Sequence, residues 1–282
     1  MSRLFWCGFF TLWPIVAIVA CAISPAMNWA FPDNEPAATE LGRRIDDLFY
    51  LILIIVTIAF IGTMAALSWA LWQASKEDKP KAWFTHGSHN LEMVWTIVPS
   101  GILLFIALYQ VDVWAMYRMR SSVDEDAYLN NVVAEVTARQ FEWRIRYPAP
   151  GTRFKDAADI HDWLSQPRAG DLYTVNHLHV PVNKQIVIWL KSGDVQHAFF
   201  VPKLRVKQDA LPGQAIDIWF NVNKAGDYDL LCAELCGWGH YKMRGRLSAV
   251  SETDYQQALQ DLKNYQEDDG VDDQPVARTT SP

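Results

Sequence analysis

The sequence has few cysteines, few charged residues and no excess of basic ones. Only four of its 282 residues are cysteine, too few for a disulfide scaffold. Charged residues make up 20% of the chain, too small a share for a disordered polyelectrolyte. The formal net charge of -7 argues against a nucleic-acid partner. Hydrophobic residues, in contrast, make up 50% of the chain and are clustered in long runs, which excludes a simple soluble globule.

The negative charge is concentrated near the carboxyl terminus. Residues 251–282 hold eight acidic and two basic side chains, whereas residues 118–250 hold 15 acidic and 17 basic ones. Residues 267–275 combine five acids with a glycine and a proline, and such a segment cannot bury a core. We therefore expect residues 252–282 to form a short helix and an acidic, disordered, solubilising tail.

Three apolar runs organise the first 120 residues. They extend from Leu4 to Ile23, from Leu48 to Trp72 and from Met93 to Tyr117. The second and third each reach the ~20 residues needed to span a bilayer, and aromatic residues near their ends suit the membrane–water interface. Residues 31–120 are therefore predicted to form a transmembrane helical hairpin in the lipid bilayer, with its spans at 48–72 and 93–117.

The loops beside the second run predict the orientation of this hairpin. The segment after it carries Lys76, Lys79 and Lys81, whereas the segment before it carries two arginines against five acids. Lysine-bearing loops tend to remain in the cytoplasm. We therefore expect the chain after Arg118 to lie on the outer, periplasmic face of a bacterial inner membrane.

Residues 1–30 allow more than one interpretation. The apolar run after Arg3 suits a signal peptide or a third, retained transmembrane helix. Residues 18–21 also resemble a bacterial lipoprotein processing site, in which Cys21 would be lipidated. The alternative is that Cys21 is an ordinary small apolar side chain in a helix. The topology of the later spans is the same in each case.

Residues 121–251 are predicted to form a β-sandwich or barrel. Short β-rich segments alternate with proline, glycine and asparagine. The segments are 132–137, 140–147, 185–190, 215–222, 228–231 and 244–250. The polar stretch 148–171 is predicted to be an irregular surface insertion, and residues 254–265 an amphipathic helix.

The strongest local signal is a group of metal-binding side chains within twelve residues. Cys232, Cys236, His240 and Met243 combine two thiols, an imidazole and a thioether, and His197 offers a second imidazole. Sulfur ligands with imidazole select copper or zinc, and the thioether favours copper because methionine is not a usual zinc ligand. A disulfide between the two cysteines is the alternative, but it leaves the imidazole and the thioether unexplained.

These motifs resemble those of subunit II of the haem–copper cytochrome c oxidases. The similarity covers nearly the whole chain from Leu48 to Val250, and two loops carry most of it. The first holds Asp194-Val195-Gln196-His197, Val201-Pro202 and Lys207-Gln208-Asp209-Ala210-Leu211-Pro212-Gly213, and the second runs from Cys232 to Met243. The resemblance implies a membrane-anchored α + all-β protein, in which the hairpin precedes a cupredoxin-like copper A domain at 121–251.

The resemblance also implies the ligands of a dinuclear copper A centre. Cys232 and Cys236 would bridge the two copper ions. His197 and Met243 would complete one copper. His240 and the backbone carbonyl of Glu234 would complete the other, and the Glu234 side chain would help to hold a magnesium ion at the boundary with subunit I. Such a centre transfers electrons and leaves no open position for a substrate.

A second similarity lies between His89 and Pro99, which resembles the segment leading into the family's second hairpin helix. The acid matching Glu92 stands there at the entrance to a proton path into subunit I. A carboxylate at the cytoplasmic membrane face suits proton collection. The alternative is a solvated acid at the start of a helix, which the helix dipole favours.

One departure concerns the point where electrons enter. The family usually has two tryptophans in an aromatic run, and the first receives electrons from cytochrome c. Here Phe141 stands at the first position and Trp143 at the second. Phenylalanine can still present an apolar docking face. The near-neutral domain suggests a donor that docks by apolar contact, or is held in a complex, rather than one steered by charge.

His177 and His179 lie two residues apart on a predicted strand and therefore share a face. We expect them to be ordinary surface histidines, with a second metal site as the alternative. Neither interpretation affects the resemblance.

The resemblance implies an electron-transfer subunit of a respiratory oxygen reductase. Electrons from cytochrome c, or a similar donor, would pass through copper A to haem in subunit I, where oxygen is reduced to water with proton pumping. Subunit III would complete the complex. Two alternatives stay open: the copper A subunit of a nitric oxide reductase and a membrane-anchored copper-delivery protein. A quinol oxidase subunit II would lack the copper ligands, and no Cys-x-x-Cys-His is present for a fused haem.

Overall fold

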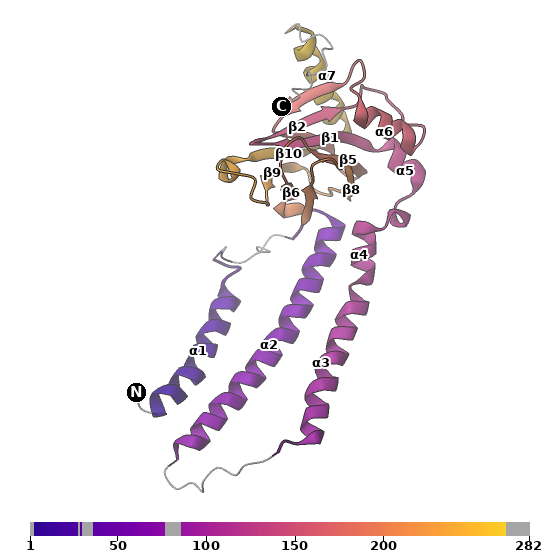
Figure 1. Ribbon diagram of the computed structural model, residues 1–282. Coiled ribbons are helices and arrows are strands. Elements are labelled where there is room, and N and C mark those ends of the chain that lie inside the picture. The colour runs from indigo at the N-terminus through magenta and orange to yellow at the C-terminus, as the bar shows by residue number, and fades with distance from the viewer. Residues whose placement is uncertain (1–2, 28, 30–35, 77–85, 269–282) are drawn as a thin grey trace. The chain divides into compact units, whose positions relative to one another are not determined.

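The computed structural model describes residues 3–27, 29, 36–76 and 86–268, in two compact units (Figure 1). The first unit comprises residues 1–36 and 44–112, and the second comprises residues 37–43 and 113–282. The acidic tail after residue 268 and the lysines at 79 and 81, which carried two of the predictions above, lie outside the described residues.

The first unit consists of apolar helices. They are α1 (Arg3–Ile23), α3 (His89–Tyr109) and all but the first four residues of α2 (Glu40–Ser75). Helix α4 (Val111–Arg118) follows α3 after Gln110, and from residue 113 onward it belongs to the second unit. In the described part of the chain, three helical segments are long and apolar enough to cross a membrane: Phe5–Ile23, Glu40–Ser75 and His89–Arg118. Few of their side chains are buried by the protein itself, as expected for helices that face lipid.

The second unit is a β domain of two five-stranded sheets (Figure 1). The first sheet has the order β3-β2-β1-β5-β8, and the second has the order β4-β10-β9-β6-β7. The strands of the first sheet are β1 (Val132–Arg139), β2 (Glu142–Tyr147), β3 (Leu172–Val175), β5 (Gln185–Ser192) and β8 (Ile216–Asn221). Those of the second are β4 (His177–Pro181), β6 (His197–Val201), β7 (Val206–Ala210), β9 (Gly226–Cys232) and β10 (Arg244–Val250). The predicted fold class is therefore confirmed.

Short helical elements connect or flank these strands. They are η1 (Arg120–Ser122), α5 (Glu125–Asn130), α6 (Ala157–Ser165), η2 (Pro202–Leu204), η3 (His240–Lys242) and α7 (Glu252–Asp268). The helix predicted at 254–265 corresponds to α7, which is slightly longer. Tyr255 and Leu259 of α7 are buried and join the main core.

One hydrophobic core combines side chains from both sheets. Trp143, Ile188, Phe199 and Leu247 come from four different strands and are at most 1% exposed. Only β2 begins with an alternation of buried and more exposed positions, whereas five consecutive residues of β5 are buried, so β5 is covered on both faces. Two of the candidate metal ligands, Cys236 and Met243, belong to this core, and Cys232 packs against it.

The segment before α2 belongs to the β domain, although it lies far from that domain in the sequence. The backbone N–H of Ala38 donates to the carbonyl of Lys203 at 2.9 Å, and the N–H of Asn223 donates to the carbonyl of Ala38 at 2.8 Å. The Thr39 hydroxyl, which is fully buried, donates to the carbonyl of Leu204 at 3.0 Å. Residues 37–43 are thus bonded into the second unit.

The stretch 148–171 was predicted to be irregular, and this prediction was wrong for its centre. Residues 157–165 form α6, with the Asp156 side chain accepting the N–H of Asp159 at 2.9 Å as an N-cap. Ile160, Trp163 and Leu164 are buried at the i, i+3, i+4 spacing of one helix face. The polar residues between them obscured this pattern in the sequence.

A buried ion network ties α6 to the first sheet. Arg146 is 7% exposed, and its guanidinium contacts the carboxylates of Glu135 and Asp171, the latter at 2.8 Å. The same guanidinium donates to the carbonyl of Trp163 at 2.8 Å, and the Trp163 indole N–H donates to Asp171. Every charge in this network therefore has a partner, which is the condition under which buried ions are tolerated.

Replacing Arg146 by leucine should strongly destabilise the β domain. Two buried carboxylates would lose their main cation, a change that typically costs about 3–5 kcal/mol. The matched control is Arg144→Ala on the same strand, since the Arg144–Glu142 pair is largely exposed and exposed pairs contribute less than about 1 kcal/mol. Urea unfolding of the full chain in detergent, followed by tryptophan fluorescence, measures both. Equal losses of free energy of unfolding would contradict the assignment.

Candidate metal centre

Strand pairing brings the candidate ligands together from two parts of the chain. β9 ends at Cys232 and β10 begins at Arg244, and the two strands are antiparallel neighbours. Residues 232–243, which we call the ligand loop, therefore start and finish side by side, and the N–H of Cys232 donates to the carbonyl of Met243 at 3.3 Å. β6 pairs with β9 through Phe199 and Cys232, which places His197, the first residue of β6, beside the loop.

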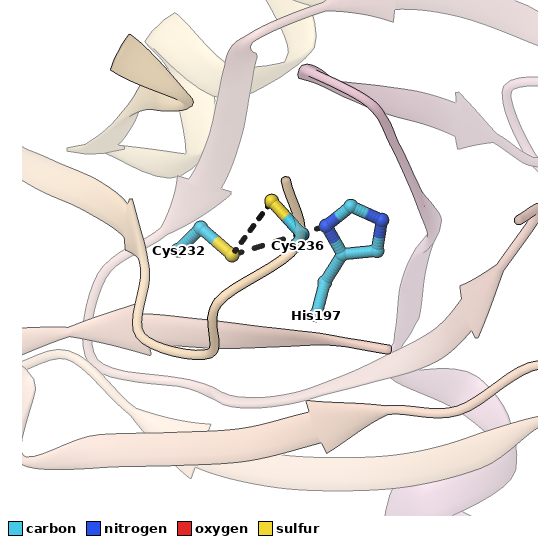
Figure 2. A group of neighbouring side chains, drawn as sticks. All are labelled: His197, Cys232 and Cys236. Atoms are coloured by element: carbon cyan, nitrogen blue, oxygen red, sulfur yellow. Dashed lines mark hydrogen bonds between the residues drawn. The ribbon is translucent and has the colours of Figure 1, made fainter. Parts of the chain in front are cut away.

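The two thiols lie close together without forming a disulfide. Their sulfur atoms are 4.0 Å apart, about twice the length of an S–S bond. The Nδ1 atom of His197 lies 3.8 Å from the Cys232 sulfur, and Figure 2 shows this arrangement. The ligand atoms of the three residues all lie within 4.8 Å of one another. Two sulfurs bound to one metal ion at about 2.3 Å each cannot be more than about 4.6 Å apart, so the thiols fit a shared metal.

The remaining candidate ligands surround the same pair of sulfurs. Nδ1 of His240 lies 3.7 Å from the Cys236 sulfur, and the Met243 sulfur lies 3.9 Å from it. The carbonyl oxygen of Glu234 lies 3.2 Å from the Cys232 sulfur. The donor set is thus two thiols, two imidazoles, one thioether and one carbonyl, and its sulfur and imidazole content suits copper.

Asp194 fixes the orientation of His197. Its carboxylate lies 2.8 Å from Nε2 of His197, so that Nδ1 points toward the Cys232 sulfur. Metal-binding histidines commonly have such a carboxylate partner. The carboxylate is itself held by the backbone N–H of Gln140 at 2.7 Å. Sequence analysis placed Asp194 in the motif that contains His197 but did not predict its hydrogen bond to the His197 ring. Its position three residues before a candidate ligand was the available signal.

Asp194 and His197 each shift the pKa of the other. Burial alone would raise the pKa of Asp194, but the Gln140 N–H and the His197 ring outweigh burial and hold that pKa below its usual value. Burial alone would lower the pKa of His197, but its contacts with Cys232 and Asp194 raise that pKa. Each group therefore stabilises the charged form of the other.

The two thiols are inequivalent in the metal-free chain. Burial disfavours ionisation of Cys232, but its contacts with His197 and the backbone of Ala198 prevail and lower its pKa to about 6. Burial raises the pKa of Cys236, and the neighbouring charge on Cys232 raises it further, to about 11. At neutral pH one sulfur is therefore a thiolate and the other a thiol, and binding metal to both must release a proton.

The sequence-predicted aromatic residues lie at different depths. Trp143 is fully buried in the core, with its ring edge-on to His197 and Phe199. Phe141 is half-buried beneath the ligand loop. A Cβ atom at Gly239 would approach the Phe141 ring to 2.4 Å, so only glycine allows the loop to lie this close.

The other sequence-predicted residues lie away from this centre. Glu92 is in the first turn of α3, where Ser88 is the N-cap, and Cys21 is exposed near the end of α1. The rings of His177 and His179 are 4.0 Å apart on β4. Of the described residues, only His197, Cys232 and Cys236 form a group of at least three His, Cys, Asp or Glu ligands close enough for one ion. The two histidines on β4 lack such a third ligand.

Comparison with known proteins gives consistent matches along the chain. Residues 132–250 match the family model described as cytochrome C oxidase subunit II, periplasmic domain, and residues 26–113 match the one described as its transmembrane domain. The chain is 30% identical over 240 residues to cytochrome c oxidase subunit 2 of Cereibacter sphaeroides, covering 78% of this chain and 77% of that protein. It is 31% identical over 261 residues to cytochrome c oxidase subunit 2 of Oenothera berteroana, covering 88% and 93%.

A similar solved structure is the periplasmic domain of subunit II of cytochrome oxidase (CoxB) of Bradyrhizobium japonicum. It is 30% identical to this chain, with 48% of this chain and 96% of that chain covered and a TM-score of 0.38.

Alkylation of the metal-free chain should distinguish the two thiols. The thiolate is the nucleophile, so iodoacetamide should modify Cys232 with a rate that rises through pH 6 and is level above it. Cys236 should stay protonated to about pH 11 and react at least about tenfold more slowly at pH 8. Peptide mapping by mass spectrometry reports the modification of each cysteine separately. The control is Cys236→Ser, which leaves Cys232 as the one remaining thiol of this pair. Faster modification of Cys236 would contradict this order.

Proposed function

The chain belongs to the cytochrome c oxidase subunit II family, and from this premise we propose that it carries a dinuclear copper A centre through which electrons enter a haem–copper oxidase. It is a subunit of an enzyme complex and a membrane protein with a periplasmic domain. Beyond family membership, we propose that the chain binds two copper ions, accepts electrons from a donor protein and passes them into the oxidase. The observation that carries it is the pair of free thiol sulfurs 4.0 Å apart, each beside an imidazole.

The ligand loop and β6 would hold both copper ions. Cys232 and Cys236 would supply thiolate ligands to both. His197, Met243, His240 and the carbonyl of Glu234 would supply the remaining ligands, as the resemblance implies. When bound, such a pair supplies a one-electron carrier whose electron is shared over both metals.

The protein's contribution to this role is rigidity. His197, Cys236 and Met243 are at most 4% exposed, and His197 and Cys232 are held by paired strands. Asp194 prevents rotation of the His197 ring, and the Gln140 amide donates to the carbonyl of Cys236. Ligands that cannot move keep bond lengths nearly constant when charge changes, and their hydrogen bonds tune the affinity for an electron.

We place this domain within a larger electron path. The donor would be cytochrome c or a similar c-type protein on the periplasmic side of a bacterial inner membrane. The acceptor would be haem in subunit I, with subunit III completing the complex. The side chain of Glu234, which is half-buried, would share a magnesium ion with subunit I.

Two other functions share part of this structure. The copper A subunit of a nitric oxide reductase would have the same centre and differ in its catalytic partner chain. A membrane-anchored copper-delivery protein would need neither Met243 nor the helical hairpin. The family membership and the presence of Met243 beside the Cys236 sulfur favour the oxidase.

Electron paramagnetic resonance of the copper-loaded full chain tests the proposal. We expect two copper ions per chain and hyperfine structure from one unpaired electron shared over both nuclei. Cys236→Ser removes one bridge, so the copper content should fall to about one ion or less and the shared signal should disappear. The control is His177→Asn, which alters a histidine outside the centre. A single isolated copper in the wild-type chain would reject the dinuclear centre.

Glu92 is proposed to collect protons for the complex. It lies at the start of α3, at the end of the hairpin next to the lysine-bearing loop. In assembled oxidase, Glu92→Gln should slow proton uptake and turnover several-fold because the titratable group is lost. The amide keeps the shape of the side chain. Asp47→Asn, near the other end of the hairpin, is the matched control. Unchanged turnover with only a small loss of stability would identify Glu92 as a helix-dipole partner.

A further inference from the structure

The ligand loop exposes an unusual amount of apolar surface. Leu235, Trp238 and Tyr241 are 77%, 77% and 78% exposed, whereas every other large hydrophobic side chain in the described residues is at most 67% exposed, including those of the apolar helices. All three lie between the first and last ligand of a single twelve-residue loop. Large apolar side chains gathered on a surface mark interaction sites, and tryptophan and tyrosine are enriched among residues that dominate binding.

Trp238 is held in place although it is exposed. Its ring meets Phe141 edge-to-face, with the centroids 5.2 Å apart, and the Lys242 ammonium lies 4.4 Å from its ring centre. It stands between two glycines that let the loop lie directly on the Phe141 ring. Gly237 has a φ of +135°, a conformation that favours glycine, and Gly239 has no room for a Cβ atom. The Phe141 ring therefore lies beneath the loop and supports Trp238, and the Trp238 ring forms the aromatic surface that faces solvent.

We propose that Trp238 is the contact through which the electron donor docks and passes its electron, in place of the residue at the Phe141 position. This inference rests on the proposed function. Trp238 lies two residues from Cys236 and two from His240, so the path from its ring to two candidate ligands is short. One electron leaves a ferrous haem, which becomes ferric, and reaches the centre held by these ligands. No bond is broken and no proton is transferred, and the indole is not itself oxidised.

The charges around the loop indicate the kind of donor. Glu142 pairs with Arg144 beside Phe141, and Arg244 pairs with Asp229 where β10 begins. These are opposite charges in pairs, and the ligand loop itself carries one acid, Glu234, and one base, Lys242, which lies over the Trp238 ring. The charged side chains in and beside the loop therefore have no excess of acidic groups to attract a strongly basic protein. The surface fits a c-type cytochrome whose exposed haem edge is framed by apolar side chains.

The test measures docking and electron transfer separately on the full chain in detergent. Binding of an oxidised, near-neutral bacterial cytochrome c to the copper-free chain is followed by calorimetry. Reduction of the copper-loaded chain is followed by stopped flow, with the same cytochrome in its ferrous form and with hexaammineruthenium(II), a small complex that needs no docking surface. The variants are Trp238→Ala, Trp238→Phe and Phe141→Leu. Tyr265→Ala, on α7 and 64% exposed in the wild type, is the matched control.

Trp238→Ala should weaken binding and slow reduction by the cytochrome at least about tenfold, which corresponds to about 1.4 kcal/mol. Trp238→Phe should retain binding within about threefold because it keeps an apolar ring. The control, and reduction by the ruthenium complex, should change less than about twofold. Binding should weaken less than about threefold between low and high salt, because little charge is involved.

The inference is overturned if Trp238→Ala binds and accepts electrons like the wild type, or if Phe141→Leu has the larger effect. Strong salt dependence would also overturn it. Failure of the proposed function looks different. The wild-type chain would then lack the two-copper signal, and binding to the copper-free chain would still decide the docking role of Trp238.

Discussion

The pairing of β9 with β10 is the constraint on which the rest of the centre depends. Their antiparallel register closes the ligand loop, and the pairing of β6 with β9 adds His197 from elsewhere in the chain. Backbone hydrogen bonds between these strands therefore set the spacing of the candidate ligands before any metal is bound. A site formed in this way is preorganised, because the cost of ordering its side chains is met by folding.

The ligand loop separates two roles between its two faces. Its inward side chains, Cys236 and Met243, are almost completely buried, whereas Leu235, Trp238 and Tyr241 of the same loop are exposed to solvent. Glycines at 237 and 239 make this division possible, because they let the backbone lie flat on Phe141. One short segment thus carries buried candidate ligands on one face and exposed apolar side chains on the other, so a partner bound to the outer face would lie close to the paired sulfurs.

The sequence predicted the fold class, because apolar runs are local patterns, and it proposed candidate ligands because their soft side chains fall within one short segment. The structure places these side chains around one pair of sulfurs. Short strands such as β3, β6 and β7 were missed, since strands of four or five residues carry little periodicity. The helix α6 was missed because only three of its residues are buried. The roles of Asp194 and Gln140 could not be predicted, because they depend on contacts between segments up to 96 residues apart.

The bonds between Ala38 or Thr39 and the η2 region have a consequence for how the protein is made. They join residues separated by 165 positions, and both membrane-spanning segments of the hairpin lie between them. The β domain therefore cannot complete its structure from its own continuous sequence. These contacts can form only after the hairpin has been inserted and the segments before and after it lie on the same side of the membrane. Completion of the β domain therefore depends on correct insertion of the hairpin.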